Sequence, residues 1–307
     1  MALGMIVILG AIHWHQILKK TLMIQKEKRR DLHAGRTVFQ FFMNDLENSG
    51  YRGCRTLDDN FPVHRLFVNF ASPMCFFRMD RKVFGFHATS GNCLNKMPKK
   101  VCKRVKENSD VLVIYNIPQA IHFLKRNMKR TNEVLYVEGE HHIRRGSVVL
   151  ISDCLQGELF IAEETEAGSI FHRKTIQTNF TDSFSKLYQK GAEITELQTV
   201  AYYLGVTARE GRLGTYSLYR DDLLHEAEEI LDKIVDFQVR FGVLVSPDVF
   251  QYKDVSEIRD DQWSMIKTVY VRVKVANPLE RDKKLQDSKG STSNVQDNKA
   301  WVYEFSI

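Results

Sequence analysis

The sequence lacks the short motifs that usually mark catalysis or cofactor binding. It contains no CxxC pair, and its 17 glycines form neither a GxGxxG pattern nor a Walker-type phosphate loop. Ser152, Asp153 and Cys154 are adjacent, but nothing around them resembles a strained nucleophile elbow. The sequence therefore gives no support for nucleotide binding, and we predict that the chain is not an enzyme and uses no cofactor.

Extreme composition and internal repeats are also missing. The 307 residues are 43% hydrophobic and 27% charged, which is ordinary for globular proteins and sufficient for one large domain or two small ones. Lysine and arginine number 44 against 38 aspartates and glutamates, so the net charge is +6. This excess permits anionic partners without requiring them.

The five cysteines fit neither a metal motif nor a small disulfide scaffold. Two alternatives remain: inert buried thiols, or one or two disulfides formed in an oxidising compartment. A disulfide between Cys93 and Cys102 would close a short loop at low entropic cost. The sequence does not decide whether Cys54 pairs with Cys75 or with Cys154.

Positive charge is clumped in two places, 96–106 and 125–130. Solvated basic loops are the favoured interpretation. The first cluster provides the candidate basic surface, which consists of Lys99, Lys100, Lys103 and Arg104. It could contact phosphates, but no aromatic residues are interleaved for base stacking, so nucleic acid is a disfavoured partner.

The densest group of potential metal ligands is Glu138, Glu140, His141 and His142. Neighbouring histidines on a strand point to opposite faces, so His141 and His142 would share one ion only in a loop. Two arginines follow them and add repulsion. We therefore expect no metal site here.

The N-terminal segment is apolar but short. Residues 1–12 carry no charge, whereas a membrane-spanning helix needs about 20 apolar residues. Neither a basic leading region nor a small-residue cleavage site of a signal peptide is present. The candidate anchor residues in this segment are Met5, Ile6, Val7, Ile8, Leu9 and Ile12.

The pattern after this segment predicts one helix from about residue 2 to Leu46, on the order of 65 Å long. Its first half is apolar all round, and its second half is amphipathic and basic, as in an anchor helix whose far end packs on a domain. The apolar residues at alternating three- and four-residue steps are Leu18, Leu22, Leu32, Phe39, Met43 and Leu46. Asn48, Ser49, Gly50 and Gly53 end the helix.

The remaining chain predicts strands. Segments rich in β-branched and aromatic residues are 110–117, 147–151, 158–162, 199–204 and 215–219. We expect a short helix at 223–233, strands at 234–243 and within 263–275, a flexible loop at 281–299 and a last strand at 300–307. A helix followed by runs of strands indicates an α+β protein, with the helix laid on an antiparallel sheet.

Several segments together resemble the PilW family of type IV pilus minor pilins. They include LGMIVILGAI, FFMNDLENSGYRGC, SDVLVIYNI, VVLISDCLQGELFIAE, LQTVAYYLGVTAREGRLGTYSLYR, EEILDKIVDFQVRFGVL and WSMIKTVYVRVKV. The segments follow the family's order and span nearly the whole chain. None is a catalytic signature, so the resemblance depends on the ordered set.

The resemblance implies a pilin-like fold and a non-enzymatic role in priming pilus assembly near the tip. Residues 1–18 would form the membrane or pilus-core half of the helix, 19–47 its amphipathic half and 48–307 a β-rich periplasmic head. The implied location is the inner membrane, crossed once, and then the pilus. The implied partners are other minor pilins, the major pilin, the inner-membrane assembly platform and, through the helix, the lipid bilayer.

Two departures from the family pattern lie at the ends of the chain. The resemblance leads us to expect a basic leader, a prepilin cleavage site and roughly two further helical turns before MALGM, and one more strand after VYEFSI. A minor pseudopilin of a type II secretion system is a related alternative. A soluble, basic nucleic-acid-binding protein is the alternative from another class.

Overall fold

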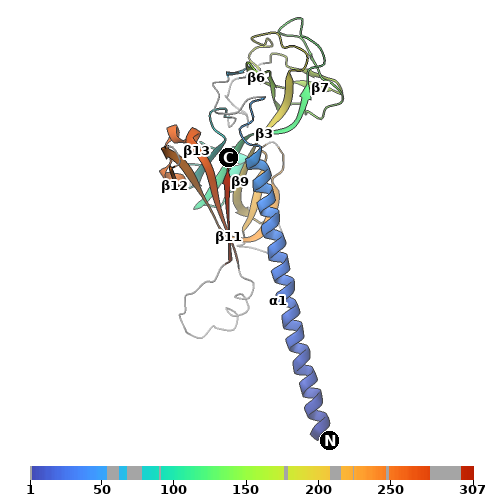
Figure 1. The fold of residues 1–307 in the computed structure, drawn as a ribbon, viewed down its shortest axis with the longest axis vertical. Coiled ribbons are helices and arrows are strands. Elements are labelled where there is room, and N and C mark those ends of the chain that lie inside the picture. Colours follow the sequence, from blue (N-terminus) through green and yellow to red (C-terminus); the bar gives the residue numbers. More distant parts are fainter. Residues whose placement is uncertain are drawn as a thin grey trace. The chain divides into compact units, whose positions relative to one another are not determined.

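The structure is a computed structural model that describes residues 2–53, 62–67, 78–89, 91–175, 179–207, 216–223, 225–246, 249–276 and 299–307; it does not describe the side chains of 2–12, 27, 28, 31 and 299. The chain divides into two compact units, Met1–Phe42 and Met43–Ile307. Figure 1 shows the helix of the first unit in blue and the strands of the second in cyan to red. The predicted loop at 281–299 lies almost wholly outside the described residues.

Helix α1 runs from Ala2 to Glu47, so its bounds lie within a residue or two of those that the periodicity predicts. Its last five residues belong to the second unit. The backbone N–H of Ser49 and its hydroxyl both donate to the carbonyl of Leu46, at 3.1 and 2.7 Å, and close the last turn. Gly50 and Gly53 follow with φ of 75° and 95°, a region that favours glycine.

The second unit is built on one large sheet, with 11 strands among the described residues. Its main path runs β1, β6, β5, β9, β10, β11, β13, β14, while β2 and β12 join at β3 and β11. Every pairing in it is antiparallel except that of β1 with β6. The bounds are β1 Val63–Arg65, β2 Val83–Ala88, β3 Ser109–Phe123, β5 Val148–Ser152, β6 Gly157–Ile161, β9 Glu193–Val206, β10 Tyr216–Asp221, β11 Glu228–Ser246, β12 Val249–Asp254, β13 Ile266–Val275 and β14 Lys299–Ser306.

A small second sheet and short helices complete this unit. The strands β4, β8 and β7 form a three-stranded antiparallel sheet, with bounds Leu135–Tyr136, Ser169–Phe171 and Glu164–Glu166. The short helices are α2 (Lys99–Cys102), η2 (Val255–Glu257) and η3 (Asp260–Met265).

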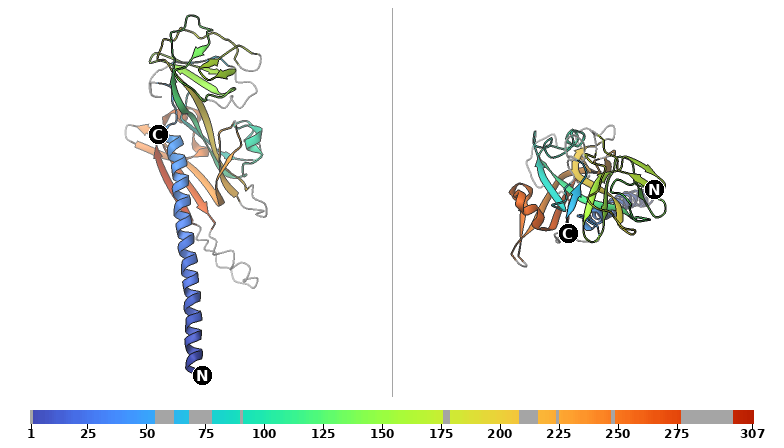
Figure 2. Two further views of the ribbon diagram at one scale, coloured as in Figure 1. Left: turned by 90° about the vertical axis from the view of Figure 1, so that its right-hand side faces the viewer. Right: turned by 90° about the horizontal axis from the view of Figure 1, so that it is seen from above.

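Strands β3 and β9 lie side by side along most of their length and connect the two ends of the large sheet (Figure 2). The first half of β9 also pairs with β5, and the second half also pairs with β10. All but the two end residues of β9 are buried. A strand buried on both faces needs a nearly continuous run of residues that tolerate burial, and ITELQTVAYYLG supplies one.

Strand β3 is irregular at the place where it binds the segment that follows α1. The register with β9 shifts between Ile114 and Ile117, and Asn116 between them has φ of 58°. Asparagine tolerates this left-handed region better than most residues. The carbonyls of Tyr115 and Asn116 accept hydrogen bonds from the N–H groups of Gly50 and Tyr51, at 2.9 and 3.1 Å.

The expected fold class is wrong. The described residues form mostly strands, and the large sheet is mixed, which conflicts with an α+β, pilin-like helix laid on an antiparallel sheet. Part of the error lies at 223–233, where LLHEAEEILDK predicts a helix. The chain instead enters β11 at Glu228 and pairs with β10. Pairing with neighbouring strands overrides the helical preference of glutamate, leucine and alanine here.

The other strand predictions agree more closely with the structure. The predicted segments at 110–117, 147–151, 158–162, 199–204 and 215–219 overlap β3, β5, β6, β9 and β10. The alternating segment in 263–275 forms β13, and 300–307 largely forms β14. Strands β1, β2, β4, β7, β8 and β12 are not predicted, because they are short or lack a long alternating pattern.

The predicted location is also wrong. In the part of the chain that the structure describes, none of the helices combines the length and apolar character that crossing a membrane requires. This finding overturns the expected single-pass inner-membrane protein with a periplasmic head. The side chains of the candidate anchor residues Met5, Ile6, Val7, Ile8, Leu9 and Ile12 lie outside the described part.

Candidate functional site: the α1 surface, its junction and the disulfide loop

Asp45 is the central residue of the junction between the end of α1 and the sheet. It is 1% exposed, although aspartate is rarely buried without partners. Arg220 of β10 donates to both of its carboxylate oxygens, at 2.7 and 2.9 Å, and the hydroxyl of Tyr202 of β9 donates at 2.6 Å. Tyr202 and Arg220 are direct partners across the β9–β10 pair, so one register position supplies both donors.

The electrostatics of this junction favour one protonation state for each partner. Burial raises the pKa of Tyr202 far above its usual range, and the neighbouring charge of Asp45 raises it further. Burial alone would lower the pKa of Arg220, but the hydrogen bonds and charge of Asp45 outweigh it and raise this pKa. The phenol therefore stays neutral and the guanidinium charged, and the bidentate geometry fixes the carboxylate.

Tyr51 provides a second attachment just after the helix. Its hydroxyl donates to Glu193 at 2.7 Å, and its ring packs against a cluster of buried hydrophobic residues that includes Leu150 and Leu159. At Gly53, a Cβ atom would lie 2.1 Å from Oγ of Ser152, so only glycine fits there without a shift.

The apolar row predicted along α1 divides into two parts in the structure. Leu46 is buried, at 2% exposure, whereas the other five residues lie at the surface. Their exposed fractions are 44% for Leu18, 62% for Leu22, 64% for Leu32, 38% for Phe39 and 43% for Met43. We call these five residues the exposed α1 row.

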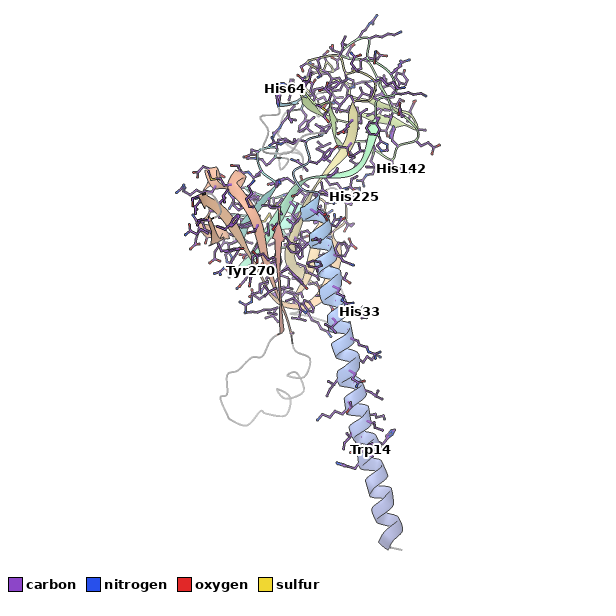
Figure 3. All side chains as sticks on the ribbon, in the orientation of Figure 1. Trp14, His33, His64, His142, His225 and Tyr270 are labelled. Atoms are coloured by element: carbon purple, nitrogen blue, oxygen red, sulfur yellow. A yellow bond between two sulfur atoms is a disulfide. The ribbon has the colours of Figure 1, made fainter. Side chains whose placement is uncertain are left out.

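Trp14 extends the apolar surface of α1 toward its beginning. It is 66% exposed, and Figure 3 shows its side chain projecting from the helix. Ile17, Met23 and Ile24 are also exposed, by 41 to 66%. Apolar side chains gathered on one helix are unusual at a free surface and mark interaction sites.

The predicted disulfide between Cys93 and Cys102 is confirmed, with the two Cα atoms 5.7 Å apart. It closes a loop that contains α2 and two of the four residues of the candidate basic surface, Lys99 and Lys100. Cys154 is also disulfide-bonded. Cys54 and Cys75 lie outside the described residues, so the choice between them stays a prediction.

Several cations of the basic cluster have partners within the chain. Lys100 donates to the carbonyl of His225, and Arg104 pairs with Glu226 at 3.2 Å. Lys106 donates to the carbonyl of Val235 at 3.1 Å. Figure 3 marks His225, which belongs to the segment between β10 and β11. Of these contacts, the one with Glu226 neutralises charge that could otherwise bind a phosphate.

Two further sets of candidate residues come from the sequence analysis: the potential metal ligands around His141 and His142, and the segment that contains Asp153. His141 is buried, with Nε2 3.3 Å from the carbonyl of Ser169, whereas His142 is exposed; both lie in a loop between β4 and β5 and not on a strand. Within the described residues, no group of histidine, cysteine, aspartate and glutamate side chains could hold a metal ion. Asp153 accepts from the N–H groups of Leu155 and Gln156, at 2.9 and 3.1 Å, and thereby shapes a turn.

Sequence reasoning missed Asp45, Tyr202 and Arg220. The only available signal is weak: Asp45 lies three residues after Phe42 and seven after Val38, and all three are buried. That spacing places a carboxylate on an apolar helix face. Their partners on β9 and β10 are set by strand register, which the sequence does not reveal.

The chain matches no protein-family model, and no match was found among curated proteins or solved structures.

Proposed function

We propose that this chain is a non-enzymatic assembly subunit that acts as a minor pilin of a type IV pilus. The proposal rests on the exposed α1 row. A 46-residue helix that leaves leucine, phenylalanine and methionine side chains in contact with water is poorly suited to act alone. Packing the row against helices of other subunits would remove this apolar surface from water.

The junction at Asp45 supports the same role. A helix that carries an assembly surface must be firmly attached to the rest of its subunit, or binding would only pull it away. The charged contacts between Asp45 and Arg220, and the hydrogen bond from Tyr202, provide such an attachment for the last turn.

We propose a pilus rather than another filament because several segments of the chain resemble minor pilins and occur in the same order. A type II secretion pseudopilus would use the same helix surface, and the genes beside this one would distinguish the two machines. The basic cluster gives the nucleic-acid alternative limited support, since Arg104 pairs with Glu226 at 3.2 Å and Lys100 lies 3.9 Å from the same carboxylate.

The test is complementation of a deletion in the bacterium that encodes the chain. The wild-type gene should restore surface pili, and the chain should be found in the sheared pilus fraction. A variant with Leu22→Gln and Leu32→Gln should be stably expressed but lost from that fraction. A control with His15→Gln and His33→Gln, at exposed polar positions of α1, should behave as wild type. Normal pili in the deletion strain would refute the proposal.

A further inference from the structure

A groove of about 250 Å³ lies beside the disulfide loop. The disulfide forms part of its wall, together with the end of β2 and the residues around α2. The residues that matter for binding are Ala88, Leu94, Lys99, Lys103, Val105 and Glu107. Binding pockets for small molecules usually start near 300 Å³, so this groove suits one or two side chains better than a drug-sized ligand.

Lys99 and Lys103 distinguish this groove from the rest of the basic cluster. Both are exposed, and the N–H of Lys103 donates to the carbonyl of Lys99, so the two lie one helical turn apart on the same side of α2. Among the described residues, neither ammonium group has an ion pair. Within the basic cluster, Lys100, Arg104 and Lys106 contact acceptors of this chain and Lys96 lies over the rings of Phe84 and Phe86; none of these four lines the groove.

Apolar groups make up much of the remaining lining. Leu94 is 58% exposed at the groove, and Val105, Ala88 and the disulfide add further apolar surface. Neither an aromatic residue nor an arginine lines it, so bases have nothing to stack on and phosphates have no planar, forked donor. Glu107 limits the net charge of the lining. The site therefore matches one apolar side chain with a carboxylate near it.

We propose that this groove binds an acidic peptide segment of a partner protein. A leucine-sized side chain enters the groove beside Leu94 and the disulfide, and neighbouring carboxylates pair with Lys99 and Lys103. The disulfide holds the two sides of the loop together, so the groove exists before the peptide arrives. This site does not involve α1, and it goes beyond the proposed assembly role.

The experiment measures binding of a short fluorescent peptide, with a central leucine flanked by glutamates, to the full chain by anisotropy. Lys99→Glu with Lys103→Glu should weaken binding roughly tenfold, because two favourable charge pairs become repulsive. Lys125→Glu with Arg130→Glu makes the same change in net charge away from the groove and should leave binding unchanged. Leu94→Ala should weaken binding a few-fold without changing its dependence on salt.

Three results would overturn the proposal. The first is absence of binding by the acidic peptide, and the second is equal loss in the Lys99/Lys103 and Lys125/Arg130 variants, which would show a non-specific charge effect. The third is stronger binding by single-stranded oligothymidine than by the peptide, with the same dependence on Lys99 and Lys103. Thermal unfolding of each variant verifies that the lysine substitutions leave the fold intact.

Discussion

Helix α1 and strand β9 place their side chains in opposite surroundings. β9 buries polar residues, including Glu196, which accepts from Ser147 at 2.9 Å and from Arg144 at 2.6 Å. The exposed α1 row leaves apolar residues in water. A buried polar group is stable only when it finds a partner inside the molecule. An exposed apolar row gains most from a partner outside it.

Removal of the Asp45 carboxylate should have the largest effect on stability, because it breaks hydrogen bonds to a buried polar group inside the second unit. Asp45→Ala leaves the partly exposed guanidinium of Arg220 and the buried hydroxyl of Tyr202 without their acceptor, so we expect a loss of about 3 kcal/mol in the free energy of unfolding. Urea denaturation of the purified chain measures it.

Two further variants refine this prediction. Glu47→Ala, at an exposed carboxylate of the same helix turn, should cost little. Asp45→Leu combined with Arg220→Met removes both charges and should recover much of the loss, because an apolar pair can replace a buried ion pair. A loss below about 1 kcal/mol for Asp45→Ala would show that water replaces the carboxylate.

His172 is a buried polar side chain whose hydrogen bonding is incomplete. It is 3% exposed among Phe160 and Phe184, and neither ring nitrogen makes a hydrogen bond of normal geometry. Burial lowers its pKa to about 4, against smaller opposing effects from the backbone of Thr131 and Asp182. The folded protein therefore binds this proton less readily than the unfolded chain.

The sign of the resulting pH dependence follows from that lowered pKa. Stability from this group is constant above the unfolded pKa of 6.5, falls as the pH drops from 6.5 to about 4, and levels off below. We expect a loss of about 2 kcal/mol between pH 7 and pH 5. His172→Phe should abolish this part of the loss, whereas His142→Gln should not. An unchanged pH profile in His172→Phe would contradict the assignment.

The disulfide loop lies outside the main sheet and depends on covalent closure. Replacing Cys93 and Cys102 by serine should lower the free energy of unfolding by roughly 2–3 kcal/mol, since the bond closes a loop with a sequence separation of 9. Thermal and urea unfolding measure the change. Asn95→Ser, an exposed substitution within the same loop, should be neutral. Equal stability of both variants would show that non-covalent contacts suffice to hold the loop.

The sequence predicts features that depend on short-range patterns. Alternation reveals β13, and the periodicity followed by Gly50 and Gly53 gives the bounds of α1. The Cys93–Cys102 disulfide was predictable because the two residues are close in the chain. The sequence does not predict the size of the sheet, the strand at 228–233 or the Asp45 junction, since these features depend on which distant strands pair. The periodic row on α1 was visible in the sequence, but the exposed fraction of each of its side chains was not.

The exposed α1 row should have the smallest effect on stability and the clearest effect on association. Leu22→Gln with Leu32→Gln replaces side chains that are already 62 and 64% exposed, so unfolding of the isolated chain should change by less than about 0.5 kcal/mol. Sedimentation velocity should show less self-association than for the wild type, while His15→Gln with His33→Gln should show no change. A clear loss of stability in the leucine variant would mean that the row packs within the subunit. If neither the stability nor the self-association of the leucine variant changed, the row would not be an assembly surface. Apolar side chains that no partner covers gain nothing from the hydrophobic effect.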